Sequence, residues 1–70
     1  MEYETRTTTL TVAGKGETLA SETATTISIT DEGAGEFIEI IQECGKIRID
    51  RAEWSPIVAA VDQLITHCRG

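Results

Sequence analysis

Two cysteines and one histidine, Cys44, His67 and Cys68, are the residues of this sequence best suited to metal binding or nucleophilic chemistry. A structural zinc site needs four ligands, usually from paired Cys or Cys-His knuckles, and these three residues lack that spacing. Cys44 and His67 also have the chemistry of a nucleophile and its base. The sequence, however, offers no recognisable third member and no oxyanion arrangement. We therefore expect no metal, no cofactor and no enzyme activity.

Acidic residues gather around one predicted turn and along the strand that follows it. Calcium loops need alternating oxygen ligands at fixed spacing with a closing bidentate Glu, and this segment lacks that pattern. A pair of catalytic carboxylates needs a cleft, which so small a domain can hardly form. The ordinary interpretation is that these acids solvate turns and sheet edges. The functional alternative is a negative surface that meets a basic protein. The residues concerned are Asp31, Glu32, Glu36, Glu39 and Glu43.

Length and composition limit the possible functions. The chain has 70 residues, and 12 Asp and Glu against 6 Lys and Arg give a net charge of −6. Hydrophobic residues make up 40% and charged residues 26%, which is typical of a folded domain, so we predict one small domain over residues 1–70. The longest apolar run, Ile57–Val61, is far shorter than the roughly 20 residues of a membrane span. The acidic, polar start does not resemble a signal peptide, so we expect a cytoplasmic protein.

Four strands and one helix would position these side chains. Thr-rich alternation predicts strands over residues 3–12 and 19–30, joined by a loop that contains Gly14 and Gly16. A third strand over residues 36–42 is apolar on both faces, and residues 46–49 form a short fourth strand. One helix can cover only one face of such a sheet. The second face therefore needs another cover, for which a second copy of the chain is the obvious candidate.

The helix is the clearest element. Asp50 and Glu53 have the spacing of a capping box, and Ile49 and Trp54 that of a hydrophobic staple. Pro56 either distorts the first turn or marks a restart of the helix after Ser55. Apolar residues then follow at helical spacing in one stripe. They are Trp54, Ile57, Val58, Val61, Leu64, Ile65 and Cys68. The expected fold is α+β: a four-stranded antiparallel meander, then one amphipathic C-terminal helix, in one layer of sheet and one of helix.

The C-terminal half resembles a known family. A short strand and turn, the segment Ile47–Trp54 and an amphipathic helix are similar to the end of the transcriptional positive-cofactor-four domain. The resemblance implies four antiparallel strands with a C-terminal helix, a homodimer formed through the helices, and single-stranded DNA bound across the sheets. The overall layout also looks like that of small accessory proteins encoded by bacteriophages.

Two functions of different classes follow. The first is a non-enzymatic protein-binding module, a homodimer that modulates or inhibits a host protein by occupying a basic surface. Its predicted dimer contacts are Phe37, Ile41, Ile57, Val61 and Leu64. The alternative is a single-stranded nucleic-acid binder with four phosphate-binding cations and one stacking ring. Those residues are Arg6, Lys46, Arg48 and Arg51, with Tyr3 as the ring. The ordinary interpretation of these cations is pairing with acids across the strands.

Overall fold

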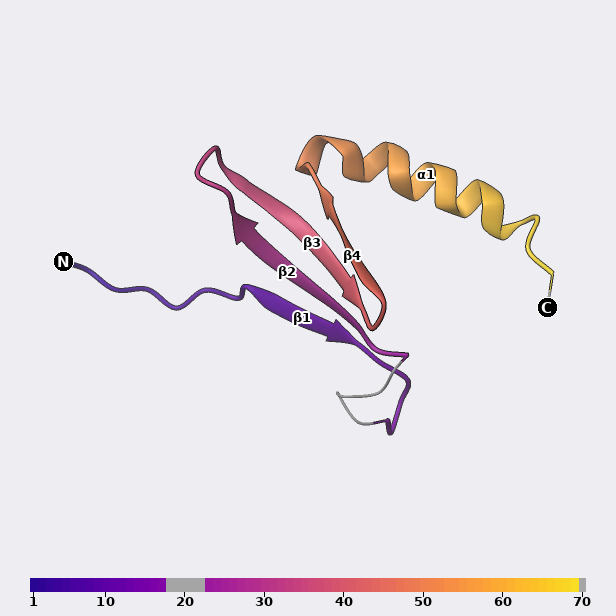
Figure 1. Cartoon of the computed structure of the whole chain (residues 1–70), viewed down its shortest axis with the longest axis horizontal. Coiled ribbons are helices and arrows are strands. Elements are labelled where there is room, and N and C mark those ends of the chain that lie inside the picture. Colours follow the sequence, from indigo (N-terminus) through magenta and orange to yellow (C-terminus); the bar gives the residue numbers. More distant parts are fainter. Residues whose placement is uncertain (18–22, 70) are drawn as a thin grey trace.

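The computed structural model describes residues 1–17 and 23–69 and confirms the expected fold class. Four antiparallel strands form one sheet in the order β1-β2-β3-β4, and a helix follows the last strand (Figure 1). The strands are β1 (Thr9–Val12), β2 (Thr25–Asp31), β3 (Glu36–Gln42) and β4 (Gly45–Ile49). A single 3₁₀ turn, Arg51–Glu53, leads into α1 (Trp54–Ile65).

The bounds of β3 agree with the sequence prediction, whereas the first strand is much shorter than predicted. Thr9 pairs with Ser28 and Val12 with Thr25. In this register a strand extended back to Tyr3 would run past Asp31, the last residue of β2. The first residues would then have no partner strand, so the predicted start at residue 3 is wrong. The predicted start of the second strand, Leu19, lies outside the described residues, and β2 itself begins only at Thr25.

The register gives the sheet two unlike faces, because successive side chains of a strand point to opposite sides. Ile27 pairs with Ile40 and Ile40 with Ile47, which places these three residues on one side. The apolar side chains of this face are those of Leu10, Val12, Ile27, Ile29, Ile38, Ile40, Ile47 and Ile49, and the register adds Asp31 and Glu36 at the end next to the β2–β3 turn. The opposite, polar face consists of Thr9, Thr11, Thr26, Ser28, Thr30, Phe37, Glu39, Ile41, Lys46 and Arg48. Phe37 and Ile41 are thus the apolar residues of β3 on the polar face.

The capping box at the start of the helical segment is confirmed. The Ala52 N–H donates to Asp50 Oδ1 over 2.9 Å, and the Asp50 N–H donates to Glu53 Oε1 over 3.1 Å. The first turn is 3₁₀, and α1 proper begins at Trp54, so Pro56 is its third residue. The first four N–H groups of an α-helix have no acceptor within the helix, so proline removes no bond from α1 there. Of the two sequence alternatives, the distorted first turn is the correct one.

The helix does not cover the sheet, which corrects the two-layer packing predicted from sequence. After the capping turn α1 runs away from the sheet (Figure 1). Among the described residues only Ile49 is buried, at 3% exposed, and Trp54 is 50% exposed. The radius of gyration is 15.0 Å, whereas a compact domain of this length has about 11 Å. The helix follows directly from the capping turn, and its side chains share a hollow with the apolar face only as far as Asp62.

Candidate protein-binding surface

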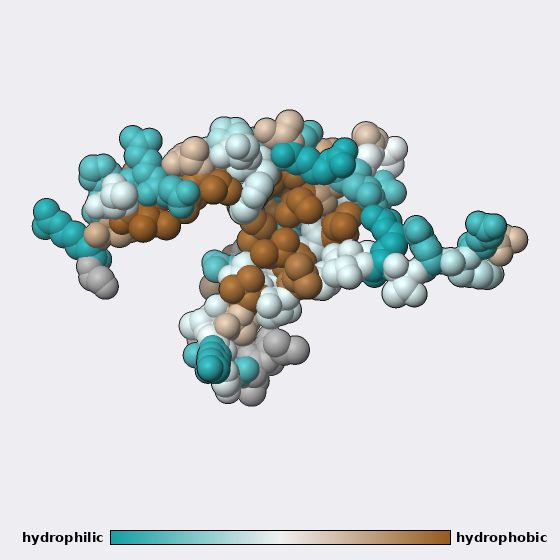
Figure 2. Space-filling model, turned by 180° about the vertical axis from the view of Figure 1, so that it is seen from behind, coloured by the Kyte–Doolittle hydropathy of each residue, from teal (hydrophilic) through white to brown (hydrophobic). Residues whose placement is uncertain are grey.

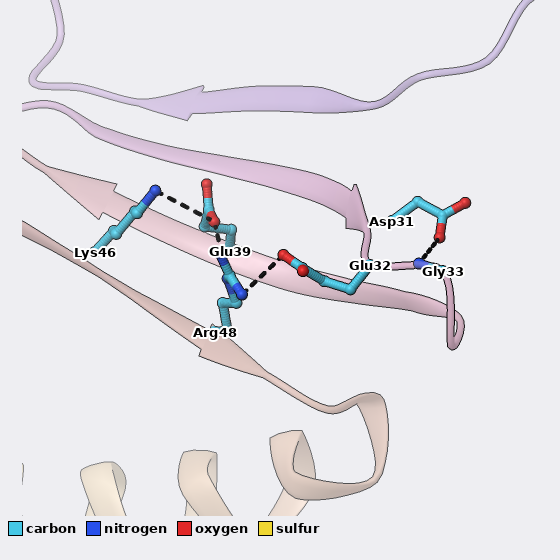
Figure 3. Close-up of polar contacts among 6 residues, drawn as sticks. All are labelled: Asp31, Glu32, Gly33, Glu39, Lys46 and Arg48. Carbon is cyan, nitrogen blue, oxygen red and sulfur yellow. Dashed lines mark hydrogen bonds and ion pairs between the residues drawn. The ribbon is translucent and has the colours of Figure 1, made fainter.

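Four members of the predicted acidic and basic groups lie close together on the polar side of the sheet and form ion pairs (Figure 3): Glu32, Glu39, Lys46 and Arg48. Arg48 is the cross-strand partner of Glu39, and its Nε lies 3.4 Å from Glu39 Oε2. Arg48 Nη1 also lies 2.8 Å from Glu32 Oε1, and Lys46 Nζ lies 4.0 Å from Glu39 Oε2. The side chain of Glu39 is only 13% exposed, while those of Lys46 and Arg48 are 59% and 51% exposed. Glu39 is therefore the anion around which this cluster forms.

A second ion pair ties the segment before β1 to the sheet. Arg6 Nη2 lies 3.0 Å from Glu36 Oε2, and both side chains are 46% exposed. Asp31 has a local role, because its Oδ1 accepts a hydrogen bond of 2.8 Å from the Gly33 N–H in the β2–β3 turn. Within residues 1–17 and 23–69, no ion pair involves Glu43 or Arg51.

These ion pairs weaken the case for both predicted charged surfaces, the acidic one and the basic one. Three of the five predicted acids pair with three of the four predicted cations, so each group neutralises much of the other. The ordinary interpretation of cross-strand pairing is confirmed for Lys46 and Arg48, while Arg6 pairs with Glu36 from the segment before β1. Tyr3, the predicted stacking ring, is 90% exposed before β1, at the opposite edge of the sheet from Arg51, which follows β4. The described residues therefore form no continuous track of cations and rings.

An unfilled apolar surface lies where α1 leaves the sheet. Side chains of β3, β4 and the segment Trp54–Asp62 of α1 line an open hollow of about 280 Å³. Ile40 and Trp54 also line an adjoining hollow of about 320 Å³, together with Ile27, Ile38 and Arg51. Figure 2 shows apolar side chains under the helix that continue onto the sheet. We call this surface the apolar angle: Ile27, Ile38, Ile40, Ile47, Ile49, Trp54, Ile57, Val58 and Val61.

The five predicted dimer contacts divide between two places. Ile57 and Val61 lie in the apolar angle, and Leu64, 65% exposed, follows them toward the end of α1. Phe37 and Ile41 lie on the polar face, where Phe37 lines a hollow with Glu32, Arg48 and Glu53. The structure therefore does not bring the helical and strand members of the predicted set together.

Sequence reasoning missed that the apolar face of the sheet stays open. Alternation in β4 and the staple spacing pointed to Ile47 and Trp54 as core residues, yet they are 58% and 50% exposed. The sequence could have shown this by comparing two quantities. The four strands place more apolar side chains on one face than one twelve-residue helix can cover.

Outside the apolar angle the described residues offer little chemistry. Among residues 1–17 and 23–69, no group of three or more His, Cys, Asp and Glu could hold a metal ion. Cys44 and Cys68 are free and exposed. No helix in this part of the chain is both long and apolar enough to cross a membrane.

Comparisons with protein-family models, with curated proteins and with solved structures found no match. The resemblance of the C-terminal half to the positive-cofactor-four domain therefore stays a prediction.

Proposed function

We propose that this chain is a small, acidic, non-enzymatic protein-binding module. The observation that carries the proposal is the apolar angle, where helix and sheet leave apolar side chains open to solvent. Large contiguous apolar patches are rare on monomeric proteins, and where they occur they mark sites of protein association. The partners in this proposal are a second copy of the chain and a different protein.

The shape of the apolar angle favours a protein over a small molecule. Small-molecule sites are concave, enclose most of the ligand and carry a few convergent polar groups that orient it. The two hollows are open, and their charged lining residues are Arg51 and Asp62. Apolar side chains of a protein partner, which need area more than enclosure, fit such a surface better.

The charge of the chain indicates the chemistry of the second partner. Ion pairing on the polar face leaves the net charge at −6. A field of this sign steers the chain toward basic protein surfaces and away from phosphate backbones. In our proposal the chain modulates a cytoplasmic host protein by occupying such a surface, in the manner of the phage accessory proteins that its layout resembles.

Single-stranded nucleic-acid binding is the weaker candidate. A phosphate contact needs a free cation, and Arg6, Lys46 and Arg48 already have carboxylate partners. A stacking platform needs several exposed rings along the track, and Tyr3 is alone before β1.

Fluorescence anisotropy with two labelled probes tests the charge argument. An oligolysine peptide should bind, with an affinity that falls as salt is added, and oligothymidine should not. Glu43→Lys should weaken peptide binding more than the control Glu2→Lys, which changes the net charge equally at a distant position. Tighter binding of oligothymidine would favour the nucleic-acid function, and binding of neither probe would refute the basic partner.

A further inference from the structure

We infer that a second copy of this chain fills the apolar angle, each copy placing its α1 against the apolar face of the other copy's sheet. The inference rests on the proposed function and deepens it, because it names the occupant and the contacting surfaces. It differs from a dimer built on Phe37 and Ile41, which lie on the polar face.

The exposed area of the chain is too large for a free monomer and close to what a dimer needs. The chain exposes 6281 Å², whereas a folded monomer of 7.6 kDa exposes about 4,300 Å². Residues 1–8, which precede β1, account for part of the excess of about 2,000 Å². Obligate homodimers bury about 1,000–2,500 Å² on each chain. The excess therefore matches one side of an obligate dimer.

The core of a single chain leads to the same conclusion. In residues 1–17 and 23–69 only Ile49 is buried, so the isolated chain lacks the enclosed apolar core that stabilises a domain. If the chain needs a cover over the apolar angle to stay folded, one covering partner must be bound to each folded chain at all times. A second copy meets this condition because in a homodimer every chain has one partner. A host protein would have to be present at the same place and in the same amount as the chain.

The two sides of the apolar angle are complementary to each other. α1 carries an apolar stripe that continues beyond its own sheet, where Leu64 and Ile65 are 65% and 59% exposed. The apolar face of the sheet is open beside it, with Ile47 at 58% exposed. A two-fold axis that puts the stripe of one copy on the face of the other creates the same contact twice. Each site then consists of strand residues from one copy and helix residues from its partner.

Charge does not oppose this contact, although each chain carries −6. The charged residues that line the two hollows are Arg51 and Asp62, which have opposite signs. Glu39 lies on the other side of the sheet, whereas Asp31 and Glu36 lie at the turn end of the apolar side, outside the lining of the two hollows, and Glu36 is paired with Arg6. Two copies that meet through their apolar angles therefore bring together a surface with little net charge.

The test is the mass of the full chain by sedimentation velocity over a range of concentrations, paired with binding of the dye ANS. We expect twice the chain mass and little ANS binding. Ile47→Glu should raise the dissociation constant about 30-fold or more, because it places a charge in a desolvated contact. The matched control is Ile41→Glu, in which the same substitution lies on the polar face opposite Lys46. It should leave the dimer intact.

The other outcomes separate the inference from the proposed function. A dimer that survives Ile47→Glu, or one lost equally in Ile41→Glu, would overturn the inference, because the copies would meet elsewhere. A wild-type monomer that binds ANS would overturn the second copy as occupant and leave the apolar angle free for a different protein. A wild-type monomer without ANS binding would refute both, since α1 would then cover its own sheet in solution.

Discussion

Glu39 of β3 and Arg48 of β4 are direct cross-strand partners whose charged atoms lie 3.4 Å apart. The two side chains differ in exposure: that of Glu39 is 13% exposed, whereas that of Arg48 is 51% exposed. Arg48 also reaches Glu32, and Glu39 also attracts Lys46. One largely buried carboxylate thus pairs with two cations of β4, and its loss leaves Lys46 without an ion pair among the described residues while Arg48 keeps Glu32.

Glu39→Gln should therefore destabilise the fold, while the same change at Glu43 should not. Partly exposed ion pairs are worth about 0.2–1 kcal/mol each, so we expect a loss of about 0.5–1.5 kcal/mol for the two pairs of Glu39. Glu43 forms no ion pair with the described residues, so Glu43→Gln should stay within about 0.5 kcal/mol of wild type. Urea unfolding at low and high salt measures both. Equal midpoints for the two variants would show that Glu39 does not organise the cluster.

The start of the helix gives a second prediction. Asp50→Ala removes the carboxylate that accepts the Ala52 N–H and should cost about 1 kcal/mol. Ser55→Ala should have little effect, because Ser55 is the second residue of α1 and not its cap. Thermal unfolding followed by circular dichroism compares the two variants. A larger loss for Ser55→Ala would mean that the helix restarts at Pro56 in solution.

The order and direction of the elements could be predicted from the sequence because each depends on local signals. Alternation over residues 36–42 defines β3, and the spacing of Asp50 and Glu53 defines the cap. The packing of α1 could not be predicted in this way. An apolar stripe shows that a helix must be covered, but it does not say whether the cover belongs to the same chain.

The charged surfaces had the same limitation. Composition and clustering suggested an acidic group and a basic group as separate sites. Only the register places Arg48 opposite Glu39, and only the close approach of the segment before β1 gives Arg6 its partner Glu36. Ion pairs between strands form where two residues are close in space. The linear sequence shows which residues are charged but not which of them neutralise each other.

The β2–β3 turn gives a third prediction that depends on backbone conformation alone. Gly33 has φ of 82°, and an added Cβ there would meet no atom within 4 Å. Gly45 offers the same open space without a positive φ. Gly33→Ala should therefore cost about 1 kcal/mol, whereas Gly45→Ala should be neutral or slightly stabilising. Matched urea unfolding curves decide this, and equal stabilities would show that the turn relaxes at no cost.

Trp54 reports on the closure of the apolar angle. It is the only tryptophan of the sequence, and its side chain lines both hollows although the residue is 50% exposed in the single chain. If a second α1 fills the angle, the indole loses water, so its emission should shift to shorter wavelength as protein concentration rises through the dissociation constant. Iodide quenching should fall over the same range.

Val61→Glu makes this measurement specific. Val61 lines the hollow together with Trp54 but lies two turns further along α1, so the variant should abolish the concentration-dependent shift without touching the indole. Thr66→Glu is the matched control, since Thr66 is the C-cap of α1 and lies outside the apolar stripe. It should keep the shift. A wild-type emission maximum that does not change with concentration, and stays that of an exposed indole, would mean that the apolar angle remains open.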